Sequence, residues 1–228
     1  MESLPKPPLR AVLFDLDGTL VDSAPDLLTA ANKLLAEVGR RALDLSELTL
    51  MVGDGVPKLV ERCFAATGEV PDEASLKDMY KRYMGFYEGH ESDLTRPYPG
   101  ALEALNRMQA EGYVMAVCTN KPHAPALGLL ASLKLERYFP VVIGADSIPG
   151  VIKPDPRVLL SALEALGATP DEAIMIGDNQ NDVIAARGAG LPVAIATYGY
   201  TRVAPADMDA DVLFDSLDEL PGIFSKIS

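Results

Sequence analysis

The chain has 228 residues and a formal net charge of −13, from 33 acidic and 20 basic side chains. Hydrophobic residues make up 48% of it, which excludes a disordered chain and predicts a sizeable buried core. The acidic balance argues against nucleic acid or an anionic membrane as a partner. Two cysteines, Cys63 and Cys118, are too few for a disulfide framework, so we expect reduced, buried thiols.

The first eight residues are rich in proline and lack the apolar stretch of a signal peptide. No apolar run elsewhere approaches the ~20 residues of a transmembrane helix. We therefore expect a cytoplasmic protein without membrane contact.

The N-terminal part holds two closely spaced carboxylates. A short apolar run at 11–14 predicts a buried strand, and Asp15 and Asp17 follow it with one residue between them. In an extended segment both side chains point to the same side, and Gly18 then permits a sharp turn. Such crowded carboxylates favour a hard cation that prefers oxygen ligands, and we expect Mg²⁺. The alternative is a β-hairpin, because Asp-Gly between apolar runs is a strong turn signal.

The next segment, 22–94, contains no strand-like stretch. Its apolar residues recur at helical spacing, which predicts helices over 22–39, 56–66 and 71–87. We expect residues 22–94 to form a helical cap inserted into a core made of 1–21 and 95–228.

From residue 98 onward, helical and strand-like patterns alternate. Helices are expected at 101–110, 124–133, 156–166 and 182–189. Strands are expected at 113–118, 141–143, 173–176 and 192–196, and the chain closes with a strand at 212–214 and a short helix at 217–224. This alternation predicts an α/β fold, a Rossmann-like parallel sheet with helices on both faces.

Polar residues follow strand after strand in this pattern. Asp15 and Asp17 follow the first strand, Thr119-Asn120-Lys121 follow the next, and Asp178 follows the strand at 173–176. Parallel strands place their carboxyl ends at one edge of the sheet, where ligands bind. We expect these groups to meet there.

Four short segments resemble, in order, the four motifs of the haloacid dehalogenase superfamily: Asp15-Leu16-Asp17-Gly18-Thr19, Thr119-Asn120, Lys153-Pro154, and Gly177-Asp178 with Asp182. The resemblance extends over essentially the whole chain, including a helical insert directly after the first motif. It implies a Rossmann-like core and catalysis through an aspartyl-phosphate.

The resemblance also implies roles for individual residues. Asp15 would be the nucleophile, and Asp17 would be the acid toward the leaving group and then the base toward water. Mg²⁺ would be held by the Asp15 carboxylate, the Asp17 backbone carbonyl and Asp178. A carboxylate about 4 Å from a phosphate dianion meets roughly 8 kcal/mol of repulsion at an effective dielectric constant of ~20, which Lys153 and the metal ion would offset.

Further groups are expected to bind the phosphoryl oxygens. These are Thr119, Asn120, Gly18 and backbone N–H groups at helix starts. Asp182 would orient Lys153 or a metal-bound water. Its alternative role is a helix N-terminal carboxylate favoured by the helix dipole.

The segments 23–27, 52–62 and 198–200 resemble those of phosphoglycolate phosphatases, which implies 2-phosphoglycolate as the substrate. Asp54 and Lys58 are the expected cap contacts, although Lys58 could equally belong to a solvated helix face. Two alternatives, a sugar-phosphate phosphatase and a sugar phosphomutase, would use the same four motifs. A further alternative is a catalytically inactive regulator that binds phosphate. In each case the partner is a small phosphorylated metabolite, bound by a monomer or a homodimer.

Overall fold

The central sheet is parallel, as the sequence predicts. The computed structural model describes residues 9–227, and the expectation for the Pro-rich segment 1–8 lies outside the described residues. Within 9–227, six strands form this sheet in the order β5-β4-β1-β6-β7-β8. Their bounds are β1 Ala11–Phe14, β4 Val114–Cys118, β5 Val141–Ile143, β6 Ala173–Gly177, β7 Val193–Ala196 and β8 Val212–Phe214.

The first strand, β1, lies in the middle of the sheet and pairs in parallel with β4 and β6. The hairpin alternative for the Asp-Gly turn is therefore wrong, because β1 has no antiparallel partner in this sheet. The central position brings the carboxyl ends of β1, β4 and β6 together at one edge.

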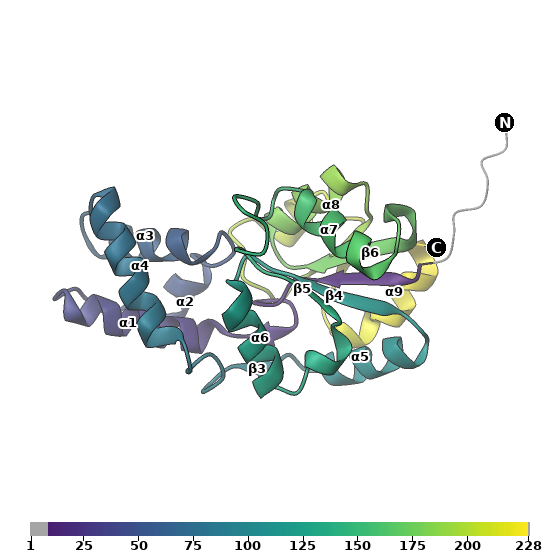
Figure 1. The fold of residues 1–228 in the computed structure, drawn as a ribbon, viewed down its shortest axis with the longest axis horizontal. Coiled ribbons are helices and arrows are strands. Elements are labelled where there is room, and N and C mark those ends of the chain that lie inside the picture. The colour runs from purple at the N-terminus through teal and green to yellow at the C-terminus, as the bar shows by residue number, and fades with distance from the viewer. Residues whose placement is uncertain (1–8, 228) are drawn as a thin grey trace.

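Helices cover both faces of the sheet (Figure 1). One face packs against α5 (Ala101–Ala110), α6 (His123–Ser132) and α9 (Leu220–Ile227). The other packs against α7 (Arg157–Leu166) and α8 (Gln180–Ala189). Because side chains alternate along a strand, Phe14 joins the first apolar cluster and Leu13 the second. Short 3₁₀ turns complete the core at Glu136–Tyr138, Pro170–Glu172, Pro205–Asp207 and Leu217–Glu219.

A separate group of helices lies beyond the carboxyl edge of the sheet (Figure 1). It consists of α1 (Ala24–Glu37), α2 (Leu45–Thr49), α3 (Val56–Thr67) and α4 (Glu73–Tyr87), which share their own apolar cluster around Leu34, Phe64 and Tyr83. Helix α2 was not expected, because five residues are too few to show a helical period. Its local signal is the capping box of Asp44 and Glu47.

A two-stranded ribbon joins this helical group to the core. Strand β2 (Val21–Asp22) pairs antiparallel with β3 (Arg96–Pro97) where the chain leaves and re-enters the core. The expectation of no strand within 22–94 is thus wrong at Asp22, because a strand of two residues is too short to show an alternating pattern. Both cysteines are free and buried, as expected.

Among the described residues, no helix combines the length and apolar character that crossing a membrane requires.

Candidate active site

Asp15 lies directly beyond β1, at the carboxyl edge of the sheet. Its N–H donates to the Ile176 carbonyl at 2.9 Å, and its Oδ1 accepts from the Leu16 N–H at 2.7 Å. The turn that follows needs Gly18, whose φ is +90° and whose position would place any Cβ 2.5 Å from Asp178 Oδ2. Gly18 thus allows the first loop to approach Asp178 closely.

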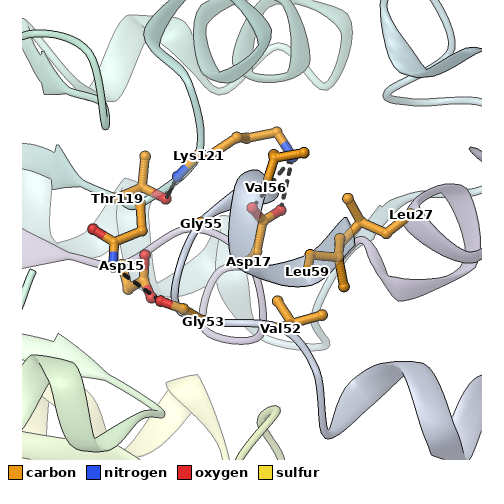
Figure 2. A pocket seen from close by; sticks show the side chains of 11 residues that line it. Asp15, Asp17, Leu27, Val52, Gly53, Gly55, Val56, Leu59, Thr119 and Lys121 are labelled. Atoms are coloured by element: carbon orange, nitrogen blue, oxygen red, sulfur yellow. Dashed lines mark hydrogen bonds and ion pairs between the residues drawn. The ribbon is translucent and has the colours of Figure 1, made fainter. Parts of the chain in front are cut away.

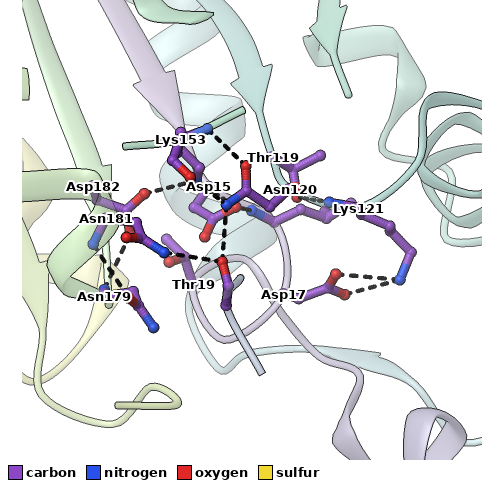
Figure 3. A network of polar contacts seen from close by, with 12 residues as sticks. Asp15, Asp17, Thr19, Thr119, Asn120, Lys121, Lys153, Asn179, Asn181 and Asp182 are labelled. Carbon is purple, nitrogen blue, oxygen red and sulfur yellow. Dashed lines mark hydrogen bonds and ion pairs between the residues drawn. The ribbon is translucent and has the colours of Figure 1, made fainter. Parts of the chain in front are cut away.

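Lys153 links Asp15 to Asp182. Its buried Nζ lies 2.9 Å from Asp15 Oδ1 and 2.7 Å from Asp182 Oδ1 (Figure 3). Burial acts to lower the pKa of Lys153, but the two carboxylates outweigh it and raise that pKa. Lys153 is therefore charged and offsets part of the negative charge on Asp15.

The remaining contacts of Asp182 are to backbone. Its Oδ2 accepts from the N–H groups of Asp178 and Asn179 at 3.1 and 3.0 Å, within the first turn of α8. It therefore both caps the helix and contacts Lys153, so the two expected roles share one side chain. Helix α8 begins before the expected residue 182 because Asn179 is its N-cap.

Three buried carboxylates form a group that could hold a metal ion. One oxygen each from Asp15, Asp178 and Asp182 lies within 4.8 Å of the others. Burial raises the pKa of Asp15 to about 6, with Asp182 adding to the rise and Lys153 opposing it. Burial and the Asp15 carboxylate also raise the pKa of Asp178 well above its usual range.

Asp178 is held by hydrogen bonds alone. It accepts from Thr19 Oγ1 at 2.8 Å and from the Tyr200 N–H at 2.6 Å. Within residues 9–227 it has no ion-pair partner. This unbalanced buried charge is an observation that fits a cation between Asp15 and Asp178. The Asp17 carboxylate stands outside this group, and its expected metal contact was through the backbone carbonyl.

Thr119 and Asn120 follow β4, but the Asn120 side chain has its hydrogen-bonding groups engaged by other residues, whereas the Thr119 side chain lines the cavity. Thr119 is buried and lines the cavity above Asp15. The Asn120 side-chain amide donates to the carbonyls of Gly53 and Lys153 at 2.9 and 2.8 Å and accepts from the Lys153 N–H at 2.8 Å. Both of its amide hydrogens are thus engaged, which leaves its backbone N–H as the expected phosphate donor.

A small cavity of ≈ 40 Å³ lies between the sheet edge and the helical group (Figure 2). Its lining residues are Asp15, Asp17, Leu27, Val52, Gly53, Gly55, Val56, Leu59, Thr119, Asn120 and Lys121. Apolar side chains from the cap surround the Asp17 carboxylate. A group bound at Asp15 would therefore have its far end enclosed by cap residues.

Lys121 is a charged residue of this cavity to which the sequence assigned no catalytic or binding role. Its buried Nζ lies 3.1 and 3.2 Å from the two carboxylate oxygens of Asp17 (Figure 3). The same Nζ also donates to the Tyr87 hydroxyl. The available signal was its position, two residues after Thr119 at the end of a central strand.

Asp54 and Lys58 do not line this cavity, although Gly53 and Gly55 do. Asp54 pairs with Arg62 and with Arg202, and accepts from Asn181 Nδ2 at 2.7 Å. Burial acts to raise the pKa of Asp54, but these donors lower it to about 2. Lys58 is exposed, pairs with Glu61 at 2.6 Å and lines a second cavity. Their expected substrate contacts stay predictions.

A parallel sheet with buried carboxylates beyond its central strands and a buried lysine in contact with them, closed by a helical cap, is typical of a class of α/β enzymes that act on anionic substrates. Comparison with known families identifies which one. Residues 12–196 match the haloacid dehalogenase-like hydrolase family, and the chain belongs to that family.

Similar proteins agree with this assignment. The chain is 42% identical to a phosphoglycolate phosphatase of Cereibacter sphaeroides, covering 96% of this chain and 99% of the relative. It is 41% identical to one of Thiobacillus denitrificans, covering 99% and 100%. A crystal structure of a predicted phosphoglycolate phosphatase from Haemophilus somnus superposes with a TM-score of 0.89 at 30% identity, covering 94% and 97%. Family and relatives support a phosphoric monoester hydrolase.

Proposed function

We propose that this protein is a Mg²⁺-dependent phosphatase that hydrolyses 2-phosphoglycolate to glycolate and phosphate through an aspartyl-phosphate. The observation that carries the proposal is the position of Lys153, whose Nζ contacts Asp15 at 2.9 Å beside the buried carboxylate of Asp178. A nucleophilic carboxylate needs such a charge arrangement before it can approach a phosphate. Relatives of nearly equal length that carry the phosphoglycolate phosphatase name support the substrate.

The reaction has two steps. An oxygen of Asp15 bonds to phosphorus while the bond from phosphorus to the ester oxygen breaks, and that oxygen takes a proton from Asp17. Water then attacks the aspartyl-phosphate and gives a proton back to Asp17. Phosphate leaves and the Asp15 carboxylate is restored. Lys153 offsets negative charge at Asp15 in both steps.

Mg²⁺ would be held by the carboxylates of Asp15 and Asp178 and the backbone carbonyl of Asp17. When bound, it would supply positive charge beside the phosphoryl group and reduce its repulsion from Asp15. Thr119 and the backbone N–H groups of Gly18 and Asn120 would donate to the phosphoryl oxygens.

The size of the cavity supports a small leaving group. The space beside Asp17 is ≈ 40 Å³ and is enclosed by Val52, Val56 and Leu59 of the cap. Glycolate requires less space than a sugar, which supports 2-phosphoglycolate over the sugar phosphates.

The test is phosphate release from 2-phosphoglycolate with Mg²⁺, by wild type and by Asp15→Asn. The variant nearly keeps the shape of the side chain but removes the nucleophile's charge. Because phosphate monoesters hydrolyse very slowly without catalysis, with enhancements reaching ~10²¹-fold, we expect negligible residual turnover. A chelator should abolish wild-type activity, and adding Mg²⁺ should restore it.

Asp78→Asn, an exposed charge on α4, is the matched control. Substantial turnover by Asp15→Asn would refute the nucleophile. Release of phosphate from sugar phosphates but not from 2-phosphoglycolate would refute the substrate and leave the mechanism standing.

A further inference from the structure

We propose that Lys121 binds the carboxylate of the substrate's leaving group and so selects acidic phosphomonoesters. This inference rests on the proposed function and names the residue that would carry its specificity.

The first observation is the charge balance of the cavity. Among the described residues that line it, Lys121 is the one cation, and its ammonium group faces the Asp17 carboxylate (Figure 2). Lys153 contacts Asp15 and Asp182 and does not line this space. A leaving-group carboxylate entering beside Asp17 would be a buried, unpaired charge unless Lys121 received it.

The second observation is distance. In 2-phosphoglycolate a single methylene separates the ester oxygen from the carboxylate carbon. The group that protonates the ester oxygen must therefore be next to the group that binds the carboxylate. Lys121 Nζ lies 3.1 Å from Asp17 Oδ1, so these two residues meet the requirement.

The third observation is how Lys121 is held. Its Nζ donates to the Tyr87 hydroxyl and lies 4.7 Å from the centroid of the Tyr87 ring. Tyr87 therefore fixes the ammonium group while the contact with Asp17 is exchangeable. A substrate carboxylate would take the place of Asp17 on Lys121, and Asp17 could then turn toward the ester oxygen.

Three other basic groups near the junction of cap and core are engaged elsewhere. Arg62 and Arg202 both pair with Asp54, and Lys58 pairs with Glu61 on the exposed side of α3. None of the three lines the cavity that contains Asp15. Lys121 is thus the basic side chain placed to meet the leaving group.

The experiment compares two substrates of nearly equal shape, 2-phosphoglycolate and its neutral amide, glycolamide phosphate. The measured quantity is the ratio of their kcat/KM values in wild type and in Lys121→Met. We expect wild type to prefer the acid and Lys121→Met to reduce that preference by roughly 10²-fold, the usual effect of removing one partner of a buried charge pair. A purely structural role would lower both kcat/KM values together and leave the ratio unchanged.

Two further variants complete the design. Lys121→Gln removes the charge but keeps hydrogen bonding, and it should reduce the preference even if Lys121→Met does not fold. Lys81→Met removes an equal charge from the exposed side of α4 and controls for net charge.

The outcomes separate this inference from the proposed function. An unchanged ratio in Lys121→Met and Lys121→Gln would overturn the role of Lys121 while wild-type hydrolysis of 2-phosphoglycolate upholds the function. Loss of the preference in Lys58→Met instead would also overturn it, and would assign the carboxylate to the cap surface. If wild type does not hydrolyse 2-phosphoglycolate, both the proposed substrate and the proposed role of Lys121 are refuted.

Discussion

Asp15 and Asp17 are two residues apart, yet each contacts a different buried lysine. Lys153 contacts Asp15 at 2.9 Å, and Lys121 contacts Asp17 at 3.1 Å. Two adjacent carboxylates sharing one cation would compete for it. Separate partners would allow the first to act as the proposed nucleophile and the second to exchange protons.

This separation leads to a prediction for Asp17→Asn. The variant keeps the nucleophile but loses the proton donor and base, so each step should slow by about 10²- to 10⁴-fold. The loss should be smaller for an aryl phosphate than for 2-phosphoglycolate, because an aryl oxide needs little protonation to leave. Steady-state rates on both substrates measure it, with Asp15→Asn as the control that should lose both. Equal losses would contradict the acid role of Asp17.

At the scale of elements, the loop before α3 is held to the core by several hydrogen bonds. The Gly53 carbonyl accepts from Asn120 Nδ2 at 2.9 Å and from Asn181 Nδ2 at 3.2 Å. Asp54 adds its contacts with Asn181 and Arg202. This loop is where the cap meets the catalytic edge, so its attachment determines how the cavity is closed.

Asp54 should therefore contribute a pH-dependent stability. The pKa of Asp54 is about 2 in the folded protein, against an ordinary value of 3.8 that we take for the unfolded chain. The contribution is present above about pH 4 and is lost as the pH falls toward 2. Because Asp54 is partly exposed, solvent screens its interactions. We therefore expect it to add about 1 kcal/mol to the free energy of unfolding, less than the full pKa shift would give.

Urea unfolding of wild type and Asp54→Asn measures this difference. At pH 7 the free energy of unfolding of the variant should be lower than that of wild type by about 1 kcal/mol. At pH 3 this difference should be smaller, because part of Asp54 is then protonated. Asp78→Asn, exposed on α4, is the control for losing one surface charge. A gap that stays constant between pH 7 and pH 3 would show that Asp54 stabilises the fold without its charge.

At the scale of the whole molecule, part of the chain's net charge of −13 is buried at the candidate site. Asp15, Asp178 and Asp182 meet there in a buried group, and Lys153 pairs with Asp15 and Asp182 but not with Asp178. A divalent ion that binds only the folded chain should stabilise it. The expected gain is about 2.7 kcal/mol at a concentration 100 times Kd.

Thermal unfolding with and without Mg²⁺ measures this gain. For a chain of this size we expect Tm to rise by roughly 5–10 °C at saturating Mg²⁺. Asp178→Asn should abolish the rise, because it removes the buried carboxylate that has no ion-pair partner in residues 9–227. NaCl of equal ionic strength is the control. An undiminished rise in Asp178→Asn would place the ion elsewhere.

Local patterns in the sequence were enough to predict the sheet and its functional edge. Apolar runs of four or five residues identify β1, β4 and β6, because buried parallel strands are apolar on both faces. The residue that directly follows each run therefore lies at the carboxyl edge of the sheet. Asp15, Thr119 and Asp178 could therefore be assigned to one edge of the sheet without coordinates. Short elements such as α2 and β2 were not predicted, because they span too few residues to show a periodic pattern.

Which side chains contact one another was decided only by the tertiary structure. Lys121 and Asp17 are separated by 104 residues in the chain, and Arg202 and Asp54 by 148. Such contacts depend on how the cap docks on the core and on which rotamers the packing allows, and neither leaves a periodic signal. The same reason explains why Asn120, expected to bind phosphate through its side chain, instead joins two loops. The sequence by itself determined which strands end at the candidate site residues, and the packing of the cap on the core determined which of those residues line the cavity.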